Sequence, residues 1–176
     1  SPIGDEGIKS LCDIEFVGLR ALRLANIGVS ALGGADVASK LVPPCDRLRQ
    51  LDLSGNDSFD ANGAAELSTH LESIGKSLEI LDLSGCSLGD NGLIWLCEAS
   101  RGLRTLPRLE TLRLGSNGIG DAAMSALANL FQHNHLPALK RCDLSMNVIS
   151  WRGAYDFTDA FDAAARAAAA VVAPPS

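Results

Sequence analysis

Residues 109–119 read LETLRLGSNGI, with leucine at 109, 112 and 114, asparagine at 117 and isoleucine at 119. Four other segments share this frame: LRALRLANIGV (19–29), LRQLDLSGNDS (48–58), LEILDLSGCSL (78–88) and LKRCDLSMNVI (139–149). The copies start at residues 19, 48, 78, 109 and 139, so the period is 29, 30, 31 and 30 residues. A near-constant period of this length predicts a solenoid, in which each repeat is one structural unit stacked on the next.

The spacing within a repeat predicts a strand followed by a helix. Leu112 and Leu114 lie two residues apart and share one strand face, which we expect to point into the core, while Arg113 points outward. Fourteen residues after the first leucine stands a small residue, which we expect to let the helix approach the strand closely. These small residues are Gly33, Gly92, Ala123 and Gly153, with Gly63 in the same place after a one-residue insertion.

Polar residues recur at two positions of the repeat, the start of the helix and the point where the chain leaves the strand. Asp is a favoured residue at helix starts, so we expect Asp5, Asp90 and Asp121 to act as N-caps, with Ser150 replacing them in the last repeat. A buried polar side chain is costly unless it is hydrogen-bonded. We therefore expect one side chain per repeat to satisfy backbone groups where the chain leaves the strand, at Asn56, Cys86, Asn117 and Asn147.

The five frames resemble the leucine-rich repeat family, in its ribonuclease-inhibitor-like branch, the NOD-like receptor and Ran GTPase-activating protein type. The resemblance covers about residues 3–161. It implies an α/β solenoid, a right-handed curved horseshoe arc with about five parallel strands on the concave face and helices on the convex face. We expect a solenoid over 1–161, consisting of a half-repeat (3–18) and the five repeats, and then an alanine-rich helical extension with a proline-containing tail (162–176). We also expect the chain to belong to a longer array.

Charge and hydropathy exclude several classes of partner. The 176 residues contain 15 Lys and Arg against 21 Asp and Glu, giving a net charge of −6. Binding of nucleic acid rests on clustered cations and is disfavoured. The longest apolar stretch (167–173) is far short of the about 20 residues that a membrane helix needs, so no membrane partner is expected.

The five cysteines are an odd number, and none forms a C-x-x-C pair. This usage predicts reduced thiols and a cytoplasmic or nuclear location. Cys86 and Cys142 occupy core positions of their repeats, so we expect both to be buried and unreactive.

The outward-pointing strand residues are the candidate binding site, because the inner surface of such a solenoid is extended and its backbone is fixed. Neighbouring strands lie about 4.8 Å apart, so residues in one column are neighbours. The alternative is that these charges merely neutralise one another. Trp151 stands where earlier repeats have Asp and either anchors a partner or packs on the neighbouring helix. The predicted partner-binding residues are Arg23, Gln50, Asp52, Ile80, Asp82, Thr111, Arg113, Arg141, Asp143 and Trp151.

Other candidates have simpler interpretations. Asp52 and Asp82 could share a proton or a metal ion, but flanking arginines favour two ionised carboxylates. The pair His133 and His135 falls short of the three or four ligands that zinc requires. The basic run Arg101, Arg104 and Arg108 indicates either a phosphate or acidic-partner contact or a solvated loop. The sequon at Asn56 is discounted, because we expect that side chain to be buried.

The sequence thus predicts a non-catalytic protein-interaction module with no metal ion, cofactor or small-molecule substrate. The alternative that the resemblance implies is a GTPase-activating protein of the Ran-directed type, although that family's acidic C-terminal tail is missing here.

Overall fold

The computed structural model describes residues 3–14, 16, 18–41, 47–101 and 106–172. Within them a five-stranded parallel sheet has the strand order β1-β2-β3-β4-β5, which is also the order in the chain. The strands are β1 (Ala21–Arg23), β2 (Gln50–Asp52), β3 (Ile80–Asp82), β4 (Thr111–Arg113) and β5 (Arg141–Asp143). The predicted leucine-rich solenoid is confirmed.

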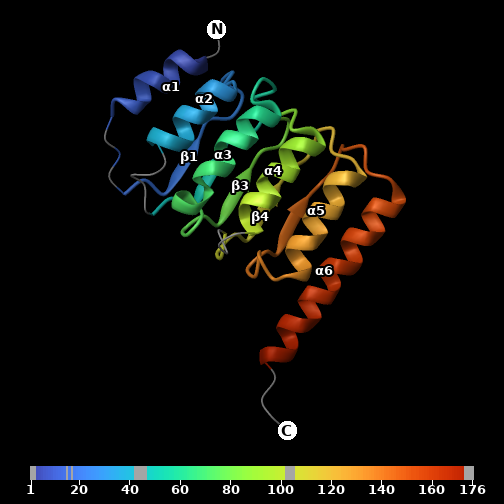
Figure 1. The fold of residues 1–176 in the computed structure, drawn as a ribbon. Coiled ribbons are helices and arrows are strands. Elements are labelled where there is room, and N and C mark those ends of the chain that lie inside the picture. Colours follow the sequence, from blue (N-terminus) through green and yellow to red (C-terminus); the bar gives the residue numbers. More distant parts are fainter. Residues whose placement is uncertain (1–2, 15, 17, 42–46, 102–105, 173–176) are drawn as a thin grey trace.

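The helices lie side by side along one face of this sheet (Figure 1). A helix follows each strand, and one precedes the first strand, so the chain alternates between the two layers. The helices are α1 (Gly4–Cys12), α2 (Ala31–Asp36) with a π-helical continuation (Val37–Leu41), α3 (Asp60–Ile74), α4 (Gly89–Arg101), α5 (Asp121–Gln132) and α6 (Trp151–Val172).

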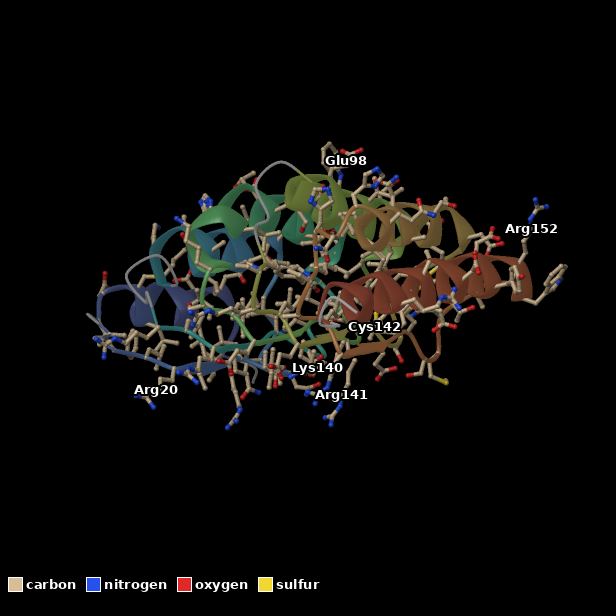
Figure 2. The ribbon with its side chains drawn as sticks, turned by 90° about the horizontal axis from the view of Figure 1, so that it is seen from below. Arg20, Glu98, Lys140, Arg141, Cys142 and Arg152 are labelled. Carbon is tan, nitrogen blue, oxygen red and sulfur yellow. The ribbon has the colours of Figure 1, made fainter. Side chains whose placement is uncertain are left out.

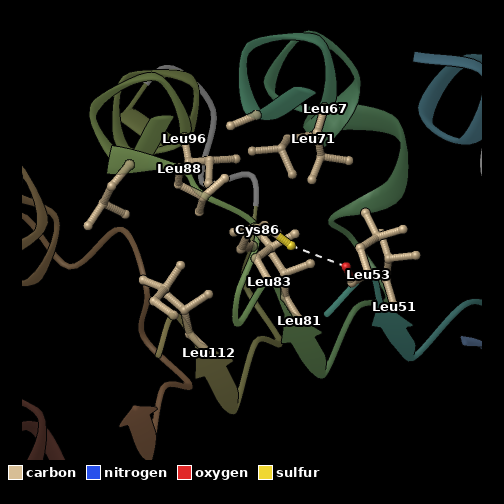
Figure 3. Packing of buried hydrophobic residues seen from close by; sticks show 14 of the residues in the cluster. Leu51, Leu53, Leu67, Leu71, Leu81, Leu83, Cys86, Leu88, Leu96 and Leu112 are labelled. Atoms are coloured by element: carbon tan, nitrogen blue, oxygen red, sulfur yellow. Dashed lines mark hydrogen bonds between the residues drawn. The ribbon is translucent and has the colours of Figure 1, made fainter. Parts of the chain in front are cut away.

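Leucines of the repeated frame fill the space between the two layers (Figure 3). Leu48, Leu51 and Leu53 are completely buried, and Leu51 pairs in register with Leu81 of the next strand. Burying one such side chain contributes about 1.5–3 kcal/mol to folding. Because each leucine packs against the repeats on either side, the stability of one repeat depends on its neighbours.

The expected role of Asp5, Asp90 and Asp121 as N-caps is wrong. α1 and α5 have no side-chain cap, and each of these carboxylates instead reaches the next repeat. Asp90 accepts a hydrogen bond from the Gly120 amide at 2.6 Å. Adjacent helices start side by side, so a first-turn carboxylate meets the amide at the start of the next helix. Ser150 does act as a cap, since its hydroxyl accepts from the Arg152 amide at 3.2 Å.

The small residues also have a role other than the predicted approach of helix to strand. At Gly33 a side-chain carbon would collide with the carboxylate of Asp5, and at Gly153 with that of Asp121. At Gly92 it would lie 3.3 Å from the Cα of Ala61, in the preceding helix. These positions are small because the previous repeat occupies the space.

The last helix continues through the alanine-rich segment to Val172, and residues 173–176 of the predicted tail lie outside the described part of the chain. Phe131 of α5 anchors it, with its ring centroid 5.4 Å from that of Phe157 and 5.1 Å from that of Phe161. Across the described residues, no helix has both the length and the apolar character needed to span a membrane.

Candidate protein-binding face

Buried asparagines hold the strands at a fixed spacing. Asn117 Oδ1 accepts from the Cys86 amide at 2.9 Å, and Asn117 Nδ2 donates to the Leu83 carbonyl at 2.8 Å. Asn147 repeats the arrangement one repeat later, accepting from the Asn117 amide at 2.9 Å. Each asparagine therefore joins its own repeat to the preceding one, which confirms the predicted role in satisfying backbone groups and gives the face a rigid backbone.

Cys86 replaces the asparagine in the third repeat. Its thiol Sγ donates to the Leu53 carbonyl at 3.1 Å, so it makes one of the contacts that an asparagine amide would make (Figure 3). Burial raises the pKa of this thiol to about 11, which keeps it protonated and able to donate. The expectation that Cys86 is buried is confirmed.

Cys142 differs from its predicted burial, because the residue is only half-buried. It belongs to the last strand, so only one neighbouring strand covers it. The side chain lies between β5 and α6 (Figure 2), and burial raises the pKa of its thiol to about 12.

The sheet brings the predicted column of outward residues together. Arg23 pairs in register with Asp52, Asp52 with Asp82, Asp82 with Arg113, and Arg113 with Asp143. Among the flanking residues, Gln50 pairs with Ile80, Ile80 with Thr111, and Thr111 with Arg141. Arg141 projects from the sheet side, away from the helices, whereas Glu98 projects from the helical side (Figure 2).

The acidic residues of the column also stabilise their own repeats. Oδ1 of Asp52, Asp82 and Asp143 accepts from the amide of the serine two residues later, at 3.0, 3.0 and 2.9 Å respectively. Hydrogen bonds from Ser145, together with the charge of Arg113, lower the pKa of Asp143 below its ordinary value. The shared spacing Asp-x-Ser in three repeats was a sequence signal for this turn, and our reading of the sequence missed it.

Arg23, Arg113 and Asp143 are the exposed members of the column, whereas Asp52 and Asp82 are more covered. Arg113 Nη1 lies 3.1 Å from Asp82 Oδ2, and Arg23 Nη2 donates to Gln50 Oε1 at 3.0 Å. Asp82 is only 8% exposed, so its carboxylate is covered while the Arg113 guanidinium stands above it. Polar side chains on neighbouring strands therefore hold two of the guanidinium groups in position, Asp82 that of Arg113 and Gln50 that of Arg23.

A model of the leucine-rich repeat family matches residues 48–68, 76–97 and 106–128. The protein is a leucine-rich repeat protein of the ribonuclease-inhibitor-like type. It is 38% identical over 126 residues to human NACHT, LRR and PYD domains-containing protein 12, covering 72% of this chain and 11% of that protein. It is 30% identical over 135 residues to pig ribonuclease inhibitor, covering 72% of this chain and 27% of that protein. The chain thus spans only a small part of these relatives.

A solved structure shows the same fold. The tropomodulin C-terminal domain of Caenorhabditis elegans superimposes with a TM-score of 0.67 and 14% sequence identity, covering 93% of this chain and 94% of that domain. At this identity the likeness concerns the leucine-rich repeat fold alone.

Trp151 of this leucine-rich repeat protein is 82% exposed, so the alternative that it packs on the neighbouring helix is wrong. Trp151 stands, in its own repeat, at the position equivalent to Asp121. The carboxylate of Asp121 bonds to Ser150 of the following repeat. Met146, Val148 and Tyr155 in the same repeat are also exposed, by 83%, 73% and 65%. The last repeat therefore exposes four large apolar or aromatic side chains.

The remaining candidates do not form a chemical site. The rings of His133 and His135 stack 6.1 Å apart, and no group of three or more metal-ligating side chains occurs among the residues that the structure describes. Asn56 is completely buried as expected, with its Nδ2 bonded to two backbone carbonyls, so its sequon is not accessible. Arg104 lies outside the described residues.

Proposed function

We propose that the concave face of this leucine-rich repeat protein binds a protein partner, and does so without catalysis of its own. The observation that carries the proposal is the row of exposed guanidinium groups of Arg23, Arg113 and Arg141 on a rigid sheet. The name of the related ribonuclease inhibitor states that it inhibits an enzyme, which supports a protein as the class of partner here.

The chemistry of the face suggests what a partner must present. Carboxylates opposite the exposed arginines would make charge-assisted hydrogen bonds, and the small side chains alongside allow close approach. The small column consists of Ala25, Ser54, Ser84, Gly115 and Ser145. Affinity would come from a few such anchors rather than from total area.

The proposed contact set is the one that the sequence predicts. Asp82 contributes to it by holding Arg113 rather than by direct contact, because it is buried. Trp151 would extend the surface onto the last repeat. The residues of the proposed site are Arg23, Gln50, Asp52, Ile80, Asp82, Thr111, Arg113, Arg141, Asp143 and Trp151.

The test begins with capture of partners from a eukaryotic cell lysate, followed by titration of the purified partner. Arg141→Glu should weaken binding by about 1–3 kcal/mol, since it reverses an exposed charge of the proposed contact set on the last strand, β5. Glu98→Arg is the matched control, because it also reverses the charge of an exposed side chain but one that projects from the helical side of the molecule (Figure 2). Equal affinity of the two variants would place the interface elsewhere.

The double variant Asp82→Lys/Arg113→Glu is a second test. It reverses both members of an ion pair, so it inverts the local field while an opposite-charge pair is retained. We expect the same range of about 1–3 kcal/mol in binding, with circular dichroism verifying that the variant remains folded.

We place this activity in the cytoplasm or nucleus, a proposal supported by the free thiols of Cys12, Cys86 and Cys142. Fractionation of cells that express the tagged chain tests it. No observation among the described residues favours the GTPase-activating alternative.

A further inference from the structure

Four arginines gather at the edge of the sheet where the strands begin. Arg20, Arg47, Arg49 and Arg108, together with Ser77, line a hollow of about 300 Å³. Arg20 precedes β1, Arg47 and Arg49 precede β2, and Arg108 precedes β4. Arg20 projects from the sheet side of the molecule (Figure 2). Only Arg108 stood out in the sequence, because Arg20, the pair Arg47 and Arg49, and Arg108 belong to three separate segments of the chain.

The backbone beneath the hollow is held by the sheet. The Arg20 carbonyl accepts from the amides of Arg49 and Gln50 at 2.8 and 3.1 Å, and the Arg49 carbonyl accepts from the amides of Glu79 and Ile80 at 2.8 and 2.9 Å. The guanidinium groups therefore start from fixed positions, and little backbone entropy is lost when a ligand binds.

Positive charge in the hollow exceeds negative charge. Arg49 Nη1 lies 3.2 Å from Glu79 Oε1, while the next acid along the edge, Glu110, is bound to Lys140 at 2.7 Å. In the part of the chain that the structure describes, Arg20, Arg47 and Arg108 form no ion pair. This local excess of cations stands out in a protein whose net charge is −6.

Two arginines of the hollow lie side by side on neighbouring strands, and Glu79 offsets the charge of only one of them. Ala21 pairs in register with Gln50, so the preceding residues, Arg20 and Arg49, are also neighbours across the two strands. Like charges directly opposite one another in a sheet are destabilising. An anion between the guanidinium groups would remove that cost.

We propose that this arginine hollow is a binding site for a phosphate monoester, carried either by a phosphorylated protein side chain or by a small soluble molecule. The planar guanidinium fork matches a phosphate bidentately. The volume lies at the lower end of the range for small-ligand sites, which suits one phosphorylated group. A nucleic acid needs an extended basic stripe, and these arginines form one compact cluster.

The test is a titration of the ¹⁵N-labelled chain followed by the Nε–Hε resonances of its arginines, in a phosphate-free buffer of low ionic strength. The probes are inorganic phosphate, the peptide acetyl-Gly-Gly-phosphoserine-Gly-Gly-amide and the same peptide without phosphate. We expect saturable chemical-shift changes, confined to the arginines of the hollow, with inorganic phosphate and with the phosphopeptide. The unphosphorylated peptide should cause none.

Variants decide whether the arginines bind the phosphate. Arg47→Ala/Arg108→Ala should weaken binding about 100-fold, since a hydrogen bond to a charged group contributes about tenfold for each arginine. The control Arg152→Ala/Arg166→Ala removes the same charge from exposed positions of α6 and should change the affinity less than about twofold. Because all four substituted side chains are exposed, both variants should retain the wild-type melting temperature.

Arg47→Lys/Arg108→Lys keeps the charge and loses the fork, so its affinity should fall between those of the wild type and the alanine variant. Tighter binding of the phosphopeptide than of inorganic phosphate would identify a protein-borne group, and equal binding a small molecule. Non-saturating shifts, shifts shared by Arg152, or equal weakening in the hollow and control variants would overturn the proposal.

Discussion

The carboxylate of Asp121 accepts two hydrogen bonds from Ser150, which lies 29 residues later in the chain: one from its amide at 2.8 Å and one from its hydroxyl at 2.6 Å. The same hydroxyl then caps α6 by accepting from the Arg152 amide at 3.2 Å. The start of one helix is therefore tied to the start of the next. Asp5 and Ser30 form the same linkage at the other end of the array.

Asp121→Ala should lower the melting temperature of the protein, because it leaves the Ser150 amide and hydroxyl without their partner. Ser150→Ala should also destabilise, and the double variant should cost less than the sum of the two single changes, since the residues act as a pair. Asp156→Ala, on the exposed side of α6, is the matched control and should leave the melting temperature unchanged. Additive single effects would show that the pair contributes no coupling.

The same pair predicts an acid dependence. Hydrogen bonds from Ser150 lower the pKa of Asp121 below its ordinary value of 3.8. The stabilisation is therefore present above about pH 3.8 and is lost as pH falls through the lower pKa of the folded state. Urea unfolding at a series of pH values should show the wild type and Asp121→Ala converging below that range.

Asn117→Ala should destabilise the protein by about 3 kcal/mol, because several buried backbone groups lose their partner at once. Cys86→Ala, at the equivalent position of the preceding repeat, should cost only about 1 kcal/mol, since the Leu53 carbonyl still accepts from Asn56 Nδ2 at 2.7 Å. Urea unfolding of the two variants measures the difference. Equal costs would mean that the asparagine adds nothing beyond what the thiol provides.

Phe131→Ala should loosen α6 selectively. Phe131 is 5% exposed and packs edge-on against Phe157 and Phe161 of that helix, so its loss creates a cavity costing about 3–5 kcal/mol. Hydrogen exchange should rise most in α6. Tyr155→Ala, which truncates a 65% exposed ring on the same helix, should leave the exchange pattern unchanged.

The thiols predict an alkaline limit to stability. Burial raises the pKa of Cys86 to about 11 and that of Cys142 to about 12, above the ordinary value of 9.0. The unfolded thiols ionise first, so the free energy of unfolding should fall as pH rises from about 9 towards these values. Cys86→Ala/Cys142→Ala should flatten that slope. An unchanged slope would indicate that neither thiol is shielded from solvent.

The repeat period and the direction of the leucines were predictable from the sequence because both are local. Leucines two residues apart must share a strand face, and the same frame recurring about every 30 residues brings equivalent strands together in register. That the asparagines bond to backbone groups was also predictable, since a polar side chain in a core position needs partners.

Contacts between different repeats depended on the tertiary structure. The neighbours of Asp121 in the sequence predict that it caps its own helix. Its carboxylate bonds to Ser150 instead, because parallel packing of the helices places the start of the next helix within hydrogen-bond distance. The same packing buries Asp82 under Arg113, leaves Trp151 exposed and collects arginines from three separate segments of the chain around one hollow. The sequence by itself determined the solenoid and the column of outward strand residues. Which of them are covered, paired or exposed was decided only when the repeats stacked, because electrostatic and hydrogen-bonding partners are selected by distance in space rather than along the chain.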